Sequence, residues 1–328
     1  MPGSRSTRPV LLILIRILLT ETDEQHPMTA TALEEALLRE GYSCERKAIY
    51  RHLEALREFG LDVLRSDAEP RGYYVASRDF ELPELRLLVA AVQSSRFISY
   101  KKSQELIDKL SALASRSEGE EIRRGVHMHG IPKTDNERVY YTLDALYRAI
   151  AANKRVAFRY FDYTPGKKKT YRNGGEPYLV SPYAVVWDDE KYYLHAYHEK
   201  YDDISAFCVD RMEDAEVSDL TRLKTAEYAG YDPSRRARTA FDQFGGKEIT
   251  VIAEFDNKLA NAVIDRFGDS VSMHAVDEGR FSARFPAAVS ERFLSWLFGF
   301  GDLVKVVAPR ELIEEYTAFL EKVRRLYD

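Results

Sequence analysis

The chain has 328 residues, enough for about two or three domains. Its formal net charge of −5 argues against a protein that coats nucleic acid through overall positive charge, but it leaves room for a local basic surface. The only cysteines are Cys44 and Cys208, which excludes a disulfide framework and a four-cysteine zinc site. With 45% hydrophobic and 31% charged residues, the composition is that of an ordinary globular protein.

The first apolar run, VLLILIRILL at residues 10–19, is too short to span a bilayer and is interrupted by Arg16. No small-residue cleavage pattern follows it, so a secretory signal is not indicated. The spacing of its leucines and isoleucines predicts a buried amphipathic helix from about Arg8 to Thr20. We expect a cytoplasmic protein.

A second helix is predicted to start at Thr29 or Thr31 and to end near Gly41, a residue type favoured just beyond a helix end. Thr31 and Glu34 fit a capping box, in which the hydroxyl and the carboxylate bind each other's free backbone N–H groups. Ser43 is a natural N-cap for a third helix spanning 44–59.

The third helix is expected to face inward through Ile49, Leu53 and Leu56. Its other face is basic and aromatic in the first half, the half that approaches base edges when such a helix enters the major groove. The two helices and their glycine-containing turn therefore predict a helix-turn-helix. The alternative is an ordinary solvated helix face. The side chains concerned are Arg46, Lys47, Tyr50 and Arg51.

After Gly60, a strand at 61–64, a loop at 65–72 and a returning strand at 73–75 predict a β-hairpin wing. Arg65 and Arg71, at the two ends of the loop, are expected to reach the DNA backbone. The stretch 43–75 resembles the winged-helix domains of DeoR-like regulators. The resemblance rests on Ser43, Arg46, the Tyr50-Arg51 pair before Leu53, and Gly72-Tyr73; His52 departs from the usual acidic residue.

Residues 79–115 are predicted to be helical, with a break near 100–103. These helices could form a homodimer interface that places two recognition helices on a two-fold DNA site, or they could pack within one chain. The charged, glycine-bearing stretch 116–135 is predicted to be a linker. The expected apolar stripe comprises Leu82, Leu87, Leu88, Val92, Leu106, Leu110 and Leu113.

From residue 136 the sequence predicts a helix at 136–153, with Leu143, Leu146, Tyr147 and Ile150 facing inward, and then several short strands. The strands at 155–163, 178–183, 184–187, 191–197 and 204–209 indicate a small curled β-barrel. Along 191–197, Tyr193, His195 and Tyr197 share one face of the strand. That face is either a half-buried barrel rim or a ligand-binding surface.

This region resembles the WYL domain. The resemblance is carried by Arg159-Tyr160, Pro177, Pro182-Tyr183, Tyr192-Tyr193-Leu194 and Phe207-Cys-Val-Asp-Arg211-Met212. It implies an Sm/SH3-like barrel that senses a nucleotide, a nucleic acid or another anionic effector.

Carried over by position, the resemblance implies effector contacts at Tyr183, Tyr193, His195 and Arg211, and Arg172 offers a second positive charge. Ser205 and Cys208 stand where many relatives carry a basic residue, which weakens the expectation of polyanion binding. The alternatives are a structural salt bridge from Arg211 to Asp210 or another carboxylate, and a packed histidine at 195.

The last part of the chain predicts a strand-helix-strand-strand-helix-strand order with an added helix, typical of a ferredoxin-like sandwich. Its WLFGFG stretch at 296–301, with the strand and helix start that follow, resembles the extension commonly found after WYL domains. The predicted units are 249–255, 260–267, 271–276, 279–285, 290–298, 304–307 and 309–326.

The expected architecture is an α+β multidomain protein. Its parts are a winged helix-turn-helix at 1–78, a helical connector at 79–135, a WYL barrel at 136–220, a linker at 221–247 and a ferredoxin-like extension at 248–328. No catalytic or phosphate-binding motif occurs, so we expect no enzyme activity, no cofactor and no metal.

We expect a ligand-responsive, homodimeric transcription regulator that binds double-stranded DNA. The alternatives are a single-stranded nucleic-acid-binding protein of non-transcriptional role and, more remotely, a nucleotide-processing enzyme.

Overall fold

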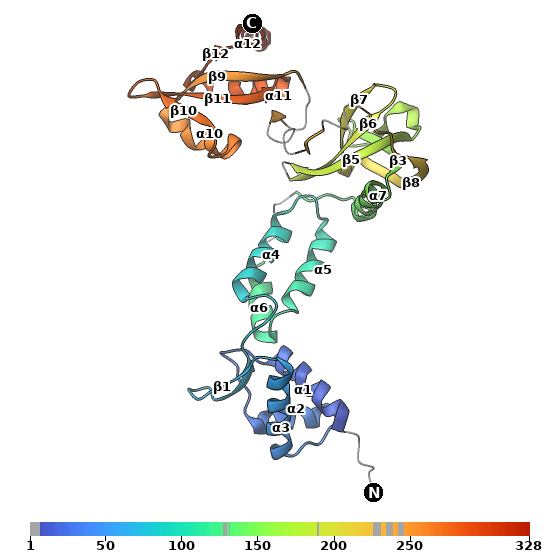
Figure 1. Cartoon of the computed structure of the whole chain (residues 1–328), viewed down its shortest axis with the longest axis vertical. Coiled ribbons are helices and arrows are strands. Elements are labelled where there is room, and N and C mark those ends of the chain that lie inside the picture. Colours follow the sequence, from blue (N-terminus) through green and yellow to red (C-terminus); the bar gives the residue numbers. More distant parts are fainter. Residues whose placement is uncertain are drawn as a thin grey trace. The chain divides into compact units, whose positions relative to one another are not determined.

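The computed structural model describes residues 7–126, 130, 132–188, 190–225, 231–233, 239–241 and 246–328. The chain divides into two compact units, Met1–Glu137 and Arg138–Asp328. The first unit is mainly helical and the second contains curled antiparallel sheets, which confirms the expected mixture of helices and strands (Figure 1). Within the described residues, no helix is long and apolar enough to cross a membrane.

The first unit begins with α1 (Thr7–Glu21), α2 (Ala30–Arg39) and α3 (Arg46–Phe59). Their apolar stripes meet in one core, as the helical spacing of these residues predicts. Gly60 ends α3 in the left-handed region, at φ 105°, where a residue without Cβ is favoured. The fully buried members of this core are Leu14, Leu18, Leu33, Leu37, Ile49, Leu53 and Leu56.

Of the two predicted starts of the second helix, Thr29 is confirmed, because its side chain caps α2 by accepting a hydrogen bond from the Ala32 backbone N–H at 3.1 Å. Thr31 lies inside α2, so the predicted capping box of Thr31 and Glu34 is wrong. The predicted N-cap of the third helix is also wrong. The third helix starts at Arg46 with Glu45 at its N-cap, so Ser43 lies two residues too early to reach the first turn. Cys44, between them, is buried and carries the chain inward before the helix begins.

A two-stranded antiparallel hairpin follows α3, formed by β1 (Val63–Ser66) and β2 (Gly72–Val75). Val63 and Val75 are paired and buried against the three helices. The first strand starts and ends about two residues later than predicted, so Arg65 lies within β1 and not in the loop.

The connector consists of α4 (Leu82–Ser94), α5 (Tyr100–Ser111) and α6 (Arg116–Arg124), with α4 and α5 side by side (Figure 1). The break lies at 95–99, before the predicted one, because Ser99 caps α5 by accepting from the Lys102 N–H. The predicted linker at 116–135 is wrong in its first part, which forms α6. The inward stripe differs too: Leu87 and Leu113 are 72% and 48% exposed, and the core is Leu85, Val89, Ile107, Ala114 and Ile122.

The second unit begins with α7 (Val139–Ala151), in which Leu146 is buried and Tyr147, expected inward, is 52% exposed. The sheet beside it has the order β4-β3-β5-β6-β7. The strand β8 also pairs with β3, on the side opposite to β5. The sequence prediction missed β8 entirely and divided β5 in two. The strands are β3 (Lys154–Tyr163), β4 (Lys169–Tyr171), β5 (Tyr178–Asp188), β6 (Lys191–His198), β7 (Asp203–Cys208) and β8 (Met212–Thr221).

The C-terminal part is a four-stranded antiparallel sheet of order β10-β11-β9-β12 around an aromatic core. Phe255, Phe285 and Phe293 are fully buried in it. Residues 226–230, 234–238 and 242–245 of the linker predicted before it lie outside the described residues. The elements are β9 (Glu248–Asp256), α10 (Ala260–Phe267), β10 (Ser272–Ala275), β11 (Arg280–Ala288), α11 (Glu291–Phe298), β12 (Val304–Ala308) and α12 (Arg310–Arg324).

Candidate nucleic-acid interface and ligand site

The first half of α3 presents a basic and aromatic surface to solvent. Arg46, Lys47, Tyr50 and Arg51 are all exposed, while Ile49 beneath them is fully buried. Nε of Arg46 donates a hydrogen bond to the Tyr50 hydroxyl at 3.0 Å, and its guanidinium lies 5.9 Å from that ring. The structure therefore brings these four predicted DNA contacts together on one helix face, and Ser43 is exposed in the turn that precedes it.

The hairpin is joined to this face by aromatic contacts. The Tyr50 ring meets the Tyr73 ring of β2 edge-on, with centroids 6.3 Å apart. Arg57, further along α3, donates to the Val63 carbonyl at 2.8 Å and lies over the same Tyr73 ring. These contacts fix the direction in which the hairpin leaves the helix.

The hairpin loop is balanced in charge. Arg65 pairs with Asp67 at 3.1 Å and Arg71 pairs with Glu69 at 3.2 Å, and all four side chains are at least 63% exposed. Exposed pairs of this kind contribute less than about 1 kcal/mol. Each arginine can therefore exchange its carboxylate for a phosphate, but the loop as a whole adds no net positive charge.

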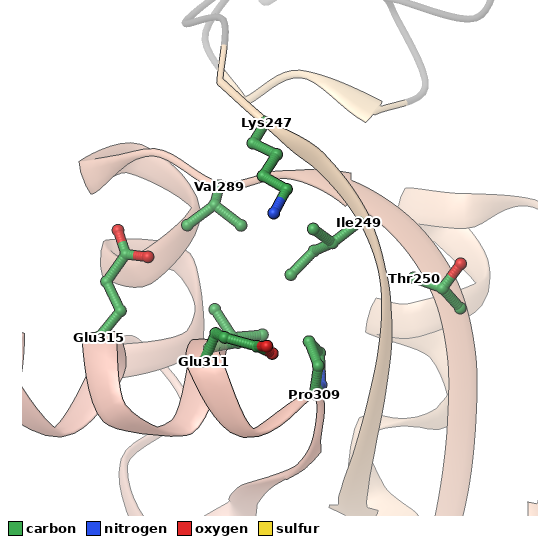
Figure 2. Close-up of a pocket in the computed structure, with 8 residues that line it drawn as sticks. Lys247, Ile249, Thr250, Val289, Pro309, Glu311 and Glu315 are labelled. Carbon is green, nitrogen blue, oxygen red and sulfur yellow. The ribbon is translucent and has the colours of Figure 1, made fainter.

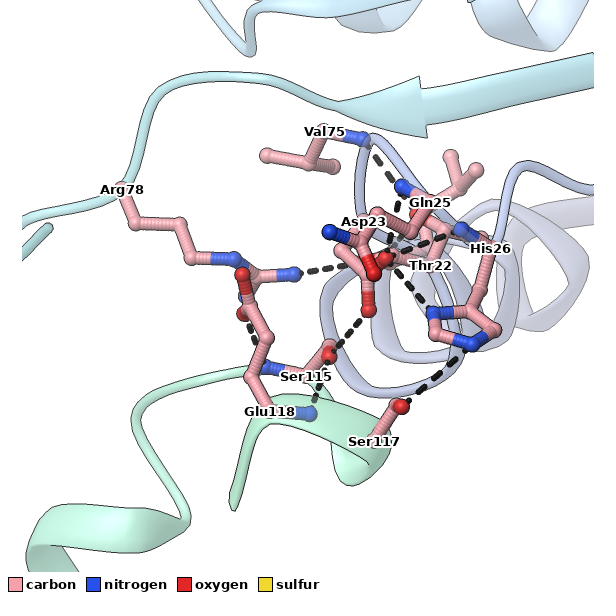
Figure 3. Close-up of polar contacts among 10 residues, drawn as sticks. Thr22, Asp23, Gln25, His26, Val75, Arg78, Ser115, Ser117 and Glu118 are labelled. Carbon is pink, nitrogen blue, oxygen red and sulfur yellow. Dashed lines mark hydrogen bonds and ion pairs between the residues drawn. The ribbon is translucent and has the colours of Figure 1, made fainter. Parts of the chain in front are cut away.

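A buried polar network joins the end of α1 to the start of α6 (Figure 3). Asp23, 5% exposed, accepts hydrogen bonds from the Ser115 hydroxyl at 2.5 Å and from the backbone N–H of Gln25 and His26. Arg78 donates to the carbonyls of Leu19 and Thr22, both at 2.7 Å. The helical core and the connector are thus held together by charge-assisted hydrogen bonds.

In the six-stranded sheet of the second unit, two of the predicted effector residues share one carboxylate. Arg172 forms a two-pronged contact with Asp162, at 2.5 and 3.1 Å, and Arg211 reaches the same carboxylate at 3.2 Å. The Arg172 hydrogen bond, followed by the nearby charge of both arginines, keeps the pKa of Asp162 below its usual value despite partial burial. The Arg172 guanidinium also lies 5.3 Å from the Tyr160 ring. All three charged side chains are about half exposed, so an anion can reach them.

Two other predicted effector residues lie elsewhere and are covered. His195 is fully buried, and its Nδ1 is hydrogen-bonded to the Tyr231 hydroxyl. Tyr183 is 7% exposed, and its hydroxyl is 3.0 Å from Oγ1 of Thr225. Tyr193 is half-buried in the middle of β6. The five predicted residues therefore do not form one open surface, because the chain after β8 covers part of it.

Positions 205 and 208, where the WYL resemblance leads us to expect basic residues, have different surroundings. Ser205 is half-buried, whereas Cys208 is buried and its backbone N–H donates to the Tyr160 hydroxyl at 3.1 Å. A charged side chain at position 208 would have to leave the buried core to reach a ligand.

Comparison with known proteins found two family matches. Residues 141–217 match the WYL domain, and residues 247–323 match the WCX domain. These two stretches are similar to the WYL and WCX domains and are called by those names below. No curated protein matches the sequence. Among the solved structures that match is the proteasome accessory factor B/C (PafBC) of Arthrobacter aurescens, at 16% identity and a TM-score of 0.28. The match covers 99% of this chain and 50% of that one, so this chain spans about half the length of PafBC.

Sequence reasoning missed two residues that organise the WYL domain. Asp162 was not singled out, although the Arg172-Asp162-Arg211 contact depends on it. Tyr231 lies 36 residues from His195, outside the matched stretch, and no local pattern links the two. The alternation of β3 places Asp162 on the same face as Tyr160, which is the one signal that could have pointed to it.

Asp210 is a further titratable group of the WYL domain, in the short 3₁₀ turn Val209–Arg211. Burial raises the pKa of its carboxyl to about 6, against the attraction of Lys191 and Arg211. Arg211 forms its salt bridge with Asp162, so of the two expected partners, Asp210 or another carboxylate, the second is the one observed.

The WCX domain contains an open pocket of about 360 Å³ between β9 and the start of α12 (Figure 2). The Lys247 ammonium points into it above the apolar side chains of Ile249 and Val289, and Glu311 and Glu315 stand on α12. All three charged side chains are exposed. Within the described residues, no group of three or more His, Cys, Asp or Glu side chains is placed to hold a metal.

Proposed function

We propose that this chain is a DNA-binding transcription regulator whose first 78 residues act as a winged helix-turn-helix and whose WYL domain senses an anionic effector. The observation that carries the proposal is the outward face of α3, where Arg46, Lys47, Tyr50 and Arg51 are exposed over a fully packed core. A helix with this division of faces fits the major groove, and the hairpin beside it fits the adjacent backbone. The PafBC likeness is too low to add to this argument.

DNA binding is tested with the double variant Arg46→Ala/Arg51→Ala on duplexes selected by the wild-type protein from a random library. Arginine contacts to bases or phosphates contribute about 1–3 kcal/mol each, so we expect affinity to fall by about 100-fold or more. The readout is fluorescence anisotropy at fixed salt.

The control is Arg39→Ala/Lys109→Ala, which removes the same charge from exposed positions on α2 and α5. It should bind nearly as well as wild type. Equal affinity of the Arg46/Arg51 variant and the wild type would contradict the DNA-reading role of α3.

The effector half of the proposal rests on Arg172 and Arg211. Both arginines pair with the carboxylate of Asp162. A phosphate can take the place of this carboxylate and pair with both positive charges. Any such ligand changes DNA binding only through its different affinity for the DNA-bound and free forms.

We expect Arg211→Ala to keep basal duplex affinity and to lose the response to a single-stranded oligonucleotide or to ATP, measured by the same anisotropy assay. Lys167→Ala/Lys168→Ala, at the exposed β3–β4 turn, serves as the control and should retain the response. A normal response in Arg211→Ala would make this arginine structural.

The second candidate is a single-stranded nucleic-acid-binding protein without a transcriptional role. It is favoured by a cation–aromatic pair on β3 and β4, where Arg159 lies 4.8 Å from the ring of half-buried Tyr171. A wild-type protein that bound single strands and selected no duplex would favour this candidate.

The proposal assigns no reaction, cofactor or metal to the chain. It includes a homodimer, because paired recognition helices match two-fold operators. It also includes a location in the cytoplasm. Sedimentation of the protein with and without a selected duplex tests that state.

A further inference from the structure

The chain that leaves β8 turns back over β5 and is tied there by hydrogen bonds. Arg222 donates two hydrogen bonds to Asn153, from its backbone N–H to the carbonyl at 2.9 Å and from Nε to Oδ1 at 3.1 Å. Its Nη1 donates to the Pro182 carbonyl at 2.9 Å. The Leu223 N–H donates to Oγ of Ser181 at 3.1 Å. These bonds fix the path of residues 222–223 beside Ser181 and Pro182 of β5.

Two side chains of this region then contact the predicted effector face. Thr225 is hydrogen-bonded to the Tyr183 hydroxyl, and Tyr231 to Nδ1 of His195. The Tyr231 ring meets His195 edge-on at 5.9 Å and lies tilted against Tyr183 at 5.8 Å. A planar ring with a hydroxyl group thus occupies the space above two of the residues that resemblance assigns to the effector.

The surface beneath is polar as well as aromatic. His195 is fully buried, and Tyr183 and Tyr197 are 7% and 8% exposed, each hydrogen-bonded through its polar atom. A ligand that brings its own ring and hydrogen-bonding groups can replace these bonds one for one, so exchange has little net cost. If the covered surface were only apolar, it would not favour a ligand with hydrogen-bonding groups.

We propose that Arg222–Thr225 and Tyr231 form an intramolecular cover over the WYL ligand face, and that an effector binds there by displacing it. The inference rests on the proposed function in that the WYL domain receives an effector, and it adds the covered face of Tyr183 and His195 to the open pair of Arg172 and Arg211 as a place where that effector binds. The displaced Tyr231 ring defines the ligand chemistry as a planar, hydrogen-bonding ring such as a nucleobase. Because the effector binds only while the face is open, its apparent affinity is its intrinsic affinity multiplied by the fraction of molecules in which the face is open.

The cover is tested first by the reactivity of His195 toward diethylpyrocarbonate in the full chain, followed by peptide mass spectrometry. His195 should be protected in the wild type and reactive in Tyr231→Ala, with exposed His274 as the internal reference. Tyr231→Phe, which keeps the ring, should show intermediate protection and guards against misfolding of the alanine variant. The matched control is Tyr327→Ala, at a residue that is 88% exposed.

The second measurement is anisotropy of a fluorescein-labelled single-stranded oligodeoxynucleotide. Loss of the Tyr231 anchor should tighten binding by about 10-fold, the equivalent of one hydrogen bond. A Ser181→Cys/Leu223→Cys pair, placed where the two residues already touch, should bind weakly when oxidised and recover on reduction.

The outcomes separate the two proposals. Continued protection of His195 in Tyr231→Ala overturns the cover and leaves the proposed effector function standing. A reactive His195 with no binding of the oligonucleotide to any variant overturns the effector site and, with it, the regulatory role of the cover. A reactive His195 with tighter binding, reversed by the oxidised cysteine pair, supports both.

Discussion

At the scale of single residues, Asp210 is a carboxyl group that folding makes harder to ionise. Burial raises its pKa from 3.8 to about 6, despite the nearby positive charges of Lys191 and Arg211. A pKa raised on folding means that the group stabilises the fold fully below about pH 4 and that this contribution is lost as the pH rises through 6. At neutral pH the ionised Asp210 therefore costs stability.

We expect Asp210→Asn to raise the free energy of unfolding at pH 7.5 by about 1–2 kcal/mol, below the roughly 3 kcal/mol that the full shift would imply. The gain should shrink as the pH falls and vanish near pH 4, where the wild-type carboxyl is protonated. Urea denaturation across this pH range measures it. Asp108→Asn, at an exposed position on α5, should leave stability unchanged at every pH. A gain that did not depend on pH would show that ionisation is not its cause.

At the scale of elements, the junction of α1 and α6 depends on the buried carboxylate of Asp23 and its hydrogen bond from Ser115. Burial alone would raise the pKa of Asp23, but the hydrogen bond from Ser115 and the contacts with His26 outweigh it and lower the pKa. The stability that Asp23 supplies is therefore present above pH 3.8 and is lost as the pH falls through its folded pKa.

Asp23→Asn should destabilise the protein by about 1–3 kcal/mol at pH 7, because hydrogen bonds to an ionised acceptor are replaced by weaker ones. Hydrogen exchange should rise at the ends of α1 and α6 more than in the middle of α3. Ser115→Ala should produce a smaller change in the same place, since it removes one partner and leaves the carboxylate charged. Uniform loss of protection across the unit would contradict a local junction.

The elements that were predictable are those whose burial follows a simple period. The third helix was clear because Ile49, Leu53 and Leu56 repeat on one face. The sixth helix was hidden because Gly119 reads as a helix breaker. In the structure, a Cβ at this position would lie 2.5 Å from the Ser111 carbonyl oxygen, so close packing requires a glycine here. The eighth strand was hidden because bulges against β3 interrupt its alternation.

The candidate site was predictable where it is local in sequence. The α3 face could be identified from one helix, and Arg172 and Arg211 were singled out through their residue type and the family resemblance. The grouping of effector residues was not predictable, because it depends on contacts between distant residues. Asp162 with Arg211 spans 49 residues and His195 with Tyr231 spans 36. Tertiary packing alone brings these pairs together.

At the scale of the whole molecule, the chain divides between Glu137 and Arg138. Glu137 is paired with Lys101 of the first unit, and Arg138 with Asp214 of the second. Each unit has its own buried cores, so each should fold without the other.

We expect fragments 1–137 and 138–328 to unfold cooperatively on their own, as followed by circular dichroism. The first should bind a selected duplex and ignore added oligonucleotide, whereas the second should show no duplex binding. If the first fragment were folded and did not bind DNA, the assignment of DNA reading to this unit would be wrong. A fragment dimer of either kind, seen by sedimentation, would locate the subunit interface.

The paired charges of the hairpin loop have a consequence for how the protein would search a genome. Because Arg65 and Arg71 are matched by Asp67 and Glu69, the proposed DNA-binding surface gains its positive charge chiefly from Arg46, Lys47 and Arg51. About three neutralised phosphates per copy give a salt slope of only about −3, which is shallow for a DNA-binding protein. In its proposed role the protein would dwell little on unrelated sequence, so few copies per cell would suffice to keep an operator occupied.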